Sequence, residues 1–375
     1  MFVIGTRPEA IKLAPLIIKA REQDDLFSTR VIITGQHREM LDQMMRHFGI
    51  EADRDLAIMS SNRNLCDVTA AALRGIGESI REEHPDLVIV QGDTSTTLAG
   101  ALAAFYSNVP VAHIEAGLRS FDKSHPWPEE VNRCLTTQLT TYHFAPTSRA
   151  KRNLLDEGIS EDRIWVCGNT AIDALFMTLE SRKHKPTVAD ESSASNRMIL
   201  VTAHRRENHG QPLESICEAI IDILDRFADV EIVFPVHMSP AVRKTVESRL
   251  GNVDRVSLID PLSYAEFVVA MNRSYLILTD SGGVQEEAPS LGKPVLVLRE
   301  VTERPEAAEA GVAKIIGTKA SDIIRETSLL LTDQDEYRRM STAINPFGDG
   351  TASTQILRVL RAAGIGSAEA DANSS

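Results

Sequence analysis

Short apolar runs alternate with amphipathic stretches along most of the chain. In the first half, these runs are bounded by turn residues and have the length of buried strands in a parallel sheet. The predicted strands are 2–4, 30–34, 87–90, 111–114, 142–145 and 164–166. Helical patterns lie between them, among them 8–21, a segment near 40–48, and 68–83. Strands separated by helices predict βαβ units in a doubly wound parallel sheet.

The same alternation returns after a polar segment without periodicity, residues 181–196, which we interpret as a loop or linker. The second set of predicted strands is 198–201, 231–236, 256–259, 276–278, 294–298 and 313–316. Its predicted helices are 213–227, 240–250, 265–272, 321–331 and 353–363. We therefore expect an α/β fold with two Rossmann-like domains, 1–170 and 171–352, which hold a ligand in the cleft between them. The polar tail, 364–375, is expected to be disordered.

Length and composition narrow the choice of partners. A chain of 375 residues favours two domains, and a net charge of −13 argues against nucleic acid or an anionic membrane as the main partner. The four cysteines show no paired spacing, which is typical of reduced cysteines in a cytoplasmic protein. The first residues lack the basic region of a signal peptide, and the longest apolar stretch, 98–112, is too short and interrupted to span a bilayer. We expect a cytoplasmic protein.

The most informative segment is TDSGGVQEEAPSLG, residues 279–292, which lies between two predicted strands. The adjacent Gly282 and Gly283 could take positive φ and let the backbone approach a ligand. The amides of Ser281, Gly282 and Gly283 would then face an anion at a helix N-terminus, as in a diphosphate site. Glu286 and Glu287 either complement the helix dipole or accept hydrogen bonds from ribose hydroxyls.

Charged residues also follow the predicted strands of the first half, where ligands bind in open α/β sheets. Arg7 and Lys12 follow the first strand and could face phosphate, or they could be surface residues of a capping loop. Asp93 follows strand 87–90, where it could instead cap the next helix. Glu115 ends strand 111–114 and has little purpose in packing, so we favour a functional role.

Two further candidates lie on the segment PWPEEVNR, residues 126–133. Glu129 begins a predicted helix, and Arg133 follows it at i+4. An ordinary surface ion pair would also explain both residues.

In the second half, a cluster of cationic side chains follows strand 198–201: His204, Arg205 and Arg206. His237 and Arg304 follow two other predicted strands. No metal-ligand spacing, G-x-G-x-x-G fingerprint or Walker Gly-Lys-Ser/Thr is present, so we expect no metal, no nicotinamide cofactor and no P-loop.

Taken together, ten motifs in register resemble the bacterial non-hydrolysing UDP-N-acetylglucosamine 2-epimerase family from residue 1 to about 363. They are GTRPEAIK (5–12), QHREMLDQ (36–43), QGDTSTT (91–97), HIEAGLRS (113–120), WPEEVNR (127–133), APTSRAKRNLL (145–155), GNTAIDAL (168–175), TAHRREN (202–208), TDSGGVQEEAPSLGKPVL (279–296) and TERPEA (302–307). The resemblance implies the GT-B architecture, with the C-terminal helix crossing back to the first domain. It also implies interconversion of UDP-N-acetylglucosamine and UDP-N-acetylmannosamine without a cofactor, and a homodimer.

The resemblance also assigns residues to roles. The residues of the implied UDP site are Arg7, Ser281, Gly282, Gly283 and Glu287, with Phe267 beside the uracil. The implied sugar, phosphate and catalytic residues are Lys12, Asp93, Glu115, Glu129, Arg133, His204 and Arg304; of these, Asp93, Glu115, Glu129 and His204 are the catalytic candidates. Some relatives bind a second UDP-N-acetylglucosamine as activator, and Gln36, Arg205 and His237 are compatible with such a site, although Glu39 stands where those relatives have Gln.

The chemistry fits these residues, because C2 of the sugar is not activated by a carbonyl. Elimination of UDP to a glycal, followed by re-addition, needs two proton-transfer positions and stabilisation of a departing diphosphate. Four alternatives stay open: a hydrolysing 2-epimerase that releases free N-acetylmannosamine, a relative that acts on a diacetamido uronic acid sugar, a GT-B glycosyltransferase, and a nucleotide-sugar-binding regulator without turnover.

Overall fold

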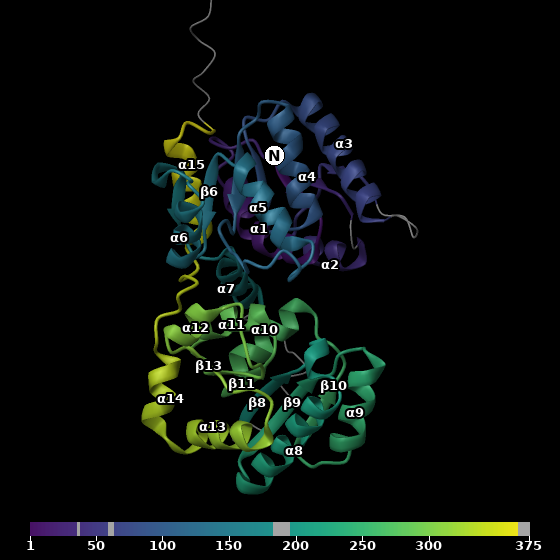
Figure 1. Cartoon of the computed structure of the whole chain (residues 1–375), viewed down its shortest axis with the longest axis vertical. Helices are drawn as coiled ribbons and strands as arrows, with labels where there is room; N and C mark the ends of the chain where they lie inside the picture. The colour runs from purple at the N-terminus through teal and green to yellow at the C-terminus, as the bar shows by residue number, and fades with distance from the viewer. Residues whose placement is uncertain (36–37, 59–63, 183–195, 367–375) are drawn as a thin grey trace, which may run out of the picture. The chain divides into compact units, whose positions relative to one another are not determined.

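The computed structural model describes residues 1–35, 38–58, 64–182 and 196–366. The chain forms two compact units (Figure 1). Unit 1 consists of Met1–Phe176 and Phe347–Ser375, and unit 2 of Met177–Pro346. The division after 176 lies within helix α7 (Thr170–Arg182), whereas the sequence led us to expect it after 170. The chain returns to unit 1 at 347, before the last helix, rather than after 352.

Unit 1 contains a seven-stranded parallel sheet in the order β3-β2-β1-β4-β5-β6-β7. Its strands are β1 (Phe2–Ile4), β2 (Val31–Ile33), β3 (Arg54–Asp55), β4 (Val88–Gln91), β5 (Val111–Ile114), β6 (Tyr142–Ala145) and β7 (Ile164–Val166). Its helices, besides α7, are α1 (Arg7–Arg21), α2 (Arg38–Phe48), α3 (Leu65–Glu83), α4 (Ser95–Tyr106), α5 (Glu129–Leu139), α6 (Ser148–Asp156), the short η1 (Glu161–Arg163) and α15 (Ala352–Ala362). Helix α15 packs against α1.

Unit 2 repeats this architecture with a six-stranded parallel sheet in the order β10-β9-β8-β11-β12-β13. Its strands are β8 (Arg197–Thr202), β9 (Val230–Pro235), β10 (Val256–Ile259), β11 (Leu276–Thr279), β12 (Val295–Val297) and β13 (Ala313–Ile315). Its helices are η3 (Arg206–Asn208), α8 (Gln211–Arg226), α9 (Pro240–Leu250), α10 (Tyr264–Arg273), α11 (Gly282–Glu287), η4 (Ala288–Leu291), α12 (Pro305–Glu309), α13 (Ala320–Thr332) and α14 (Gln334–Ser341).

Both sheets have the strand order of a Rossmann fold, so the predicted α/β class with two Rossmann-like domains is confirmed. The central strands are buried on both faces, which explains their continuous apolar sequence. In such sheets there is one pair of neighbouring strands whose outgoing connections lead to opposite sides of the sheet. Ligands bind beyond the carboxyl ends of that pair. The pair is β1 and β4 in unit 1, and β8 and β11 in unit 2.

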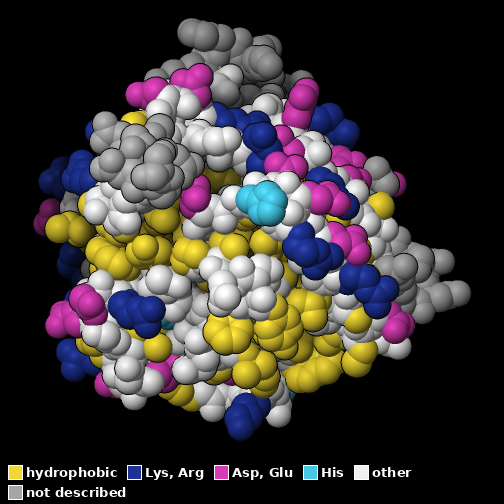
Figure 2. Space-filling view, turned by 90° about the horizontal axis from the view of Figure 1, so that it is seen from above, with side chains coloured by type: hydrophobic (Ala, Val, Ile, Leu, Met, Phe, Trp, Pro, Cys, Tyr) yellow, Lys and Arg dark blue, Asp and Glu magenta, His cyan; other side chains and the backbone are white. Residues whose placement is uncertain are grey.

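Not all apolar side chains are in the core. Figure 2 shows that hydrophobic side chains, in yellow, gather in patches on the face of the molecule seen there. In unit 1, Phe105 and Tyr106 at the end of α4 are 56% and 70% exposed. Among the helices of the described ranges, none combines the length and the apolar character needed to cross a membrane.

Candidate functional site

The strand ends of unit 1 bring together most of the residues that the sequence singled out. Arg7 is the first residue of α1, directly after β1, and Asp93 follows β4. Glu115 follows β5, the neighbour of β4 in the sheet. The three residues therefore lie at the carboxyl edge of adjacent strands, as their positions in the sequence predicted.

Glu115 is held firmly between two donors. Its Oε2 atom accepts hydrogen bonds from Lys12 Nζ, at 2.5 Å, and from Gln91 Nε2. The Glu115 side chain is 7% exposed, and its backbone has a φ of +67°, which is unusual for a residue with a side chain. Strain of this kind persists where surrounding contacts fix the backbone, and it is frequent at functional sites.

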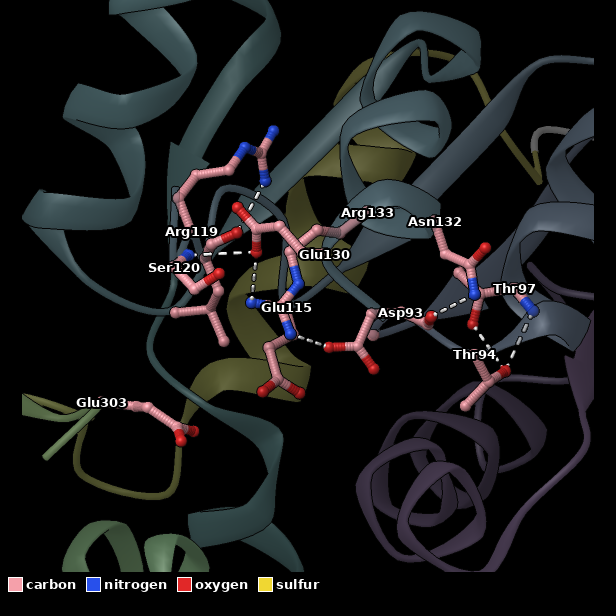
Figure 3. A network of polar contacts seen from close by, with 12 residues as sticks. Asp93, Thr94, Thr97, Glu115, Arg119, Ser120, Glu130, Asn132, Arg133 and Glu303 are labelled. Atoms are coloured by element: carbon pink, nitrogen blue, oxygen red, sulfur yellow. Dashed lines mark hydrogen bonds and ion pairs between the residues drawn. The ribbon is translucent and has the colours of Figure 1, made fainter. Parts of the chain in front are cut away.

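Asp93 forms an ion pair with Arg133 (Figure 3). Asn132 Nδ2 also donates to the backbone oxygen of Asp93, at 2.9 Å. The alternative in which Asp93 caps helix α4 is wrong, because Thr94 is the capping residue and its Oγ1 accepts from Thr97 N at 3.1 Å. Asp93 is therefore held from α5, whose first turns approach the end of β4.

Arg133 does not form the surface ion pair with Glu129 that their spacing allowed. Its second ion pair is with Glu130, at i−3 and 3.2 Å, and not with Glu129 at i−4. Glu130 is buried and accepts hydrogen bonds from the backbone amides of Ser120 and Phe121, at 3.0 and 2.9 Å (Figure 3). The side chain of Glu129, the half-buried first residue of α5, forms no hydrogen bond or ion pair with the described residues. Its carboxylate is thus available to a ligand.

A buried carboxylate that the sequence analysis did not single out, Glu9, connects two of these turns. Glu9 Oε2 accepts from the backbone amides of Gly5 and Thr6, at 2.9 and 2.5 Å. Its Oε1 accepts from the hydroxyls of Thr94 and Thr97, at 2.6 and 3.1 Å. Burial raises the pKa of the Glu9 carboxyl, and the hydrogen bonds from Thr94, Thr6 and Gly5 act in the opposite direction. The signal in the sequence was a Thr followed three residues later by Glu at a helix start.

His113 supports the same region from the core. Its Nε2 atom lies 2.7 Å from the backbone oxygen of Gly92, the residue before Asp93. Because the oxygen is an acceptor, the imidazole donates through Nε2. Burial lowers the pKa of His113 to about 4, so this ring is neutral at pH 7.

In unit 2, the Ser-Gly-Gly turn begins helix α11, with Ser281 as its N-cap residue. The expectation of positive φ at Gly282 and Gly283 is wrong, because both residues belong to the helix and have ordinary helical backbone. Crowding does not explain the glycines either, because a Cβ atom at either position would meet only ordinary van der Waals contacts. A Cβ atom on Gly282 would lie 3.6 Å from the Arg304 guanidinium carbon and 3.9 Å from Arg205 Nη2. Two arginines thus lie close to the start of α11.

The acidic pair of this segment also differs from the expectation. Glu286 and Glu287 are the last residues of the six-residue helix and not part of its first turn, so they do not complement its N-terminal dipole. Glu286 is buried and pairs with Arg304. Glu287 is half-buried, and its Oε1 would lie 3.7 Å from a Cβ atom on Gly283. The spacing between Gly283 and Glu287 along the helix therefore places the Glu287 carboxylate beside the glycines.

His204, after β8, lies beside another buried carboxylate that the sequence did not single out, Asp280 after β11. The His204 Nε2 to Asp280 Oδ1 distance is 3.6 Å. The rings of His204 and His237 are 6.0 Å apart, and Arg205 Nε donates to the Asp280 backbone oxygen at 3.0 Å. Burial is the main cause that lowers the pKa of His204; Asp280 opposes this effect, and His237 and Arg205 add to it.

The remaining candidates are less well connected. Phe267 is half-buried on α10, which packs against η4, directly after Glu287. Gln36 lies outside the described residues. Within the ranges that the structure describes, no three His, Cys, Asp or Glu side chains are grouped as a metal ion would require.

Each unit thus presents a different chemistry. Unit 1 presents carboxylates beside cations: Glu115 with Lys12, and Asp93 with Arg133. Unit 2 presents a histidine and arginines near a glycine-rich helix start, an arrangement suited to a phosphorylated ligand.

Comparison with known proteins identifies the family. The sequence model of the UDP-N-acetylglucosamine 2-epimerase family matches residues 19–361. The UDP-N-acetylglucosamine 2-epimerase of Escherichia coli strain K12 is 50% identical over 366 residues, which cover 96% of this chain and 97% of the relative. That of Bacillus subtilis strain 168 is 50% identical over 360 residues, which cover 96% and 94%.

Solved structures agree with this result. The crystal structure of UDP-GlcNAc 2-epimerase from Neisseria meningitidis bound to UDP-GlcNAc superposes with a TM-score of 0.86. It is 45% identical, and the match covers 96% of this chain and 99% of that one. The enzyme from Methanocaldococcus jannaschii in complex with UDP-GlcNAc and UDP gives a TM-score of 0.77 at 36% identity, with 96% and 99% covered. Sequence and fold therefore agree that the chain belongs to the UDP-N-acetylglucosamine 2-epimerase family.

Proposed function

We propose that this protein catalyses the reversible interconversion of UDP-N-acetylglucosamine and UDP-N-acetylmannosamine. The observation that carries the proposal is the placement of Asp93 and Glu115, each paired with a cation, at adjacent strand ends in a chain of this family. Carboxylates at such an edge can accept and return a proton. A nucleotide-sugar-binding protein without turnover would have little use for them, because they repel an anionic ligand.

The reaction we propose is an elimination followed by an addition. The C2 proton passes to a carboxylate of unit 1, the C1–oxygen bond breaks, and the electron pair of the C2–H bond forms the C1–C2 double bond of a glycal. UDP leaves with the electrons of the C1–oxygen bond. Re-addition of UDP at C1, with a proton delivered to the opposite face of C2, gives the epimer. Asp93, Glu115 and Glu129 are the candidates for the two proton-transfer roles.

Unit 2 supplies the binding of the departing UDP in this proposal. The amides at the start of α11 and the guanidinium group of Arg304 stabilise the negative charge of the diphosphate. Glu287 accepts hydrogen bonds from the ribose, and Phe267 lies beside the uracil, as the family resemblance implies. His204 neutralises part of the negative charge of the leaving diphosphate.

The identity of the product tests this proposal. Purified protein is incubated with UDP-N-acetylglucosamine, and the mixture is separated by anion-exchange chromatography. We expect UDP-N-acetylmannosamine to form until its ratio to UDP-N-acetylglucosamine is constant. The same ratio should be reached when the reaction starts from UDP-N-acetylmannosamine. Free N-acetylmannosamine with an equal amount of UDP would instead indicate the hydrolysing reaction, and an absence of turnover would contradict the proposal.

The proposal extends to the assembly and the setting of the enzyme. We propose a homodimer in the cytoplasm that supplies N-acetylmannosamine units for cell-surface polysaccharide. Light scattering coupled to size-exclusion chromatography tests the homodimer, with a mass of twice 41.2 kDa expected. Activation by a second UDP-N-acetylglucosamine is tested by whether the rate depends sigmoidally on substrate concentration.

A further inference from the structure

Asp280 of unit 2 is a fully buried carboxylate with an uneven set of contacts. Its Oδ2 atom accepts three hydrogen bonds, from the backbone amides of His204 and Arg205, both at 2.8 Å, and from Asn208 Nδ2 at 2.9 Å. Its Oδ1 atom is buried and has no hydrogen-bond partner within the described ranges. The side-chain nitrogen that approaches Oδ1 is His204 Nε2, at 3.6 Å.

The three contacts of Oδ2 explain why an acceptor stands at this position, but they do not explain a charge. An asparagine could accept the same hydrogen bonds through its oxygen. A buried carboxylate with one unpaired oxygen is unfavourable and calls for a partner that compensates it. His204 fits that role, since a distance of 3.6 Å is longer than a hydrogen bond and a small rotation of this ring would close it.

The charges around His204 indicate what the carboxylate does there. His237, on the loop after β9, and Arg205, on the same loop as His204, disfavour a positive charge on the imidazole. Asp280, after β11, is the acidic group that favours it. The imidazole is 43% exposed, so it remains accessible to a ligand while Asp280 lies beneath it.

We propose that Asp280 is a positioning residue for His204: its Oδ1 orients the imidazole and stabilises the protonated form that neutralises a departing diphosphate. This inference rests on the proposed function. The arrangement uses the principle by which a buried carboxylate orients a histidine and stabilises its imidazolium.

The test compares wild-type protein with Asp280→Asn, which retains an acceptor for the amides of His204 and Arg205. The pKa of His204 is measured by NMR titration of its Cε1–H signal, assigned with His204→Gln. We expect the pKa of His204 to fall by at least about 1 unit in Asp280→Asn, because a negative charge this close shifts a pKa by about 1–3 units. Asp229→Asn, which removes an exposed carboxylate paired with Arg197, is the matched control and should leave the His204 pKa unchanged.

Kinetics then separate positioning from a structural effect. We expect kcat of Asp280→Asn to fall about 10- to 100-fold. In the His204→Gln background, the same substitution should have little further effect, because Asp280 then has no histidine to orient. If Asp280→Asn fails to fold, Asp280→Ser is the second variant, and added formate should restore part of the His204 pKa and of kcat.

An unchanged His204 pKa in Asp280→Asn, or an equal loss of kcat with and without His204, would overturn the inference. The NMR titration does not depend on turnover. If the wild-type protein does not epimerise its substrate, the proposed function fails while the pKa difference still decides whether Asp280 acts on His204.

Discussion

At the scale of single residues, the charged groups of unit 1 are fixed more tightly than surface residues would be. Glu115 has two donors and a left-handed backbone conformation, and Asp93 is held by an arginine and an asparagine of the same helix. Such constraints keep the groups oriented before a substrate binds, which lowers the barrier of a proton transfer.

The first prediction concerns Glu115→Gln. The amide keeps the size of the side chain but cannot accept the C2 proton, so we expect kcat to fall at least about 100-fold. The affinity for UDP, measured by calorimetry, should change little, because Glu115 is not among the proposed UDP-binding residues, which are Arg7 in unit 1 and those of α11 with Arg304 in unit 2. Glu161→Gln, which alters an exposed ion pair with Lys151, is the control. Parallel losses of UDP affinity and activity would contradict the assignment.

The second prediction concerns the pH dependence of stability. His113 and His143 are buried on the neighbouring strands β5 and β6, and burial lowers their pKa values from 6.5 to about 4 and about 3. Between pH 6.5 and these values, the unfolded chain binds protons that the native state does not, so the free energy of unfolding decreases as the pH falls. At pH 5 each histidine should account for a loss of about 2 kcal/mol.

Urea denaturation at pH 7 and pH 5 measures this effect. His143→Leu should reduce the loss between the two pH values by about 2 kcal/mol. His84→Asn is the control, because His84 is exposed and ends α3 in the left-handed conformation, which asparagine also adopts. An equal pH dependence in His143→Leu and wild type would show that His143 is not the cause.

At the scale of helices and strands, the apolar runs predicted the sheet well and the polar elements poorly. Strand β3, Arg54–Asp55, has two polar residues and therefore no apolar run. Helix α14, Gln334–Ser341, buries only Met340 and so lacks the periodic apolar face on which a prediction depends. The helical backbone of Gly282 and Gly283 could not be predicted either, because adjacent glycines favour several conformations.

The third prediction tests a close approach between elements. Gly117, between β5 and α5, has a φ of +87°, and a Cβ atom there would overlap the backbone oxygen of Ala150 on α6. Gly158 has a similar φ of +84° but no atom within 4 Å of a Cβ. Gly158→Ala should therefore cost only about 1 kcal/mol of strain, whereas Gly117→Ala should cost several. Urea denaturation of both variants measures the difference, and equal losses would mean that α6 moves aside easily.

At the scale of the whole molecule, the sequence predicted two Rossmann-like units and placed Arg7, Asp93, Glu115, His204 and Ser281 after their strands. It did not single out Glu9 and Asp280. Each accepts hydrogen bonds from a segment distant in sequence, Thr94 and Thr97 for Glu9, and His204 and Arg205 for Asp280. These distant donors meet the carboxylates only in the folded chain, although the spacing of Thr6 and Glu9 already indicated the local hydrogen bonds of Glu9.

The final prediction is the reaction itself, followed by proton NMR of UDP-N-acetylglucosamine with the protein in deuterated water. Elimination and re-addition exchange the C2 proton with solvent, so deuterium should enter C2 as UDP-N-acetylmannosamine forms. The same deuterium should also appear at C2 of the remaining UDP-N-acetylglucosamine, because the reaction is reversible. UDP-N-acetylmannosamine that retains the original proton at C2 would contradict exchange through a glycal, and a spectrum that never changes would contradict the proposed function.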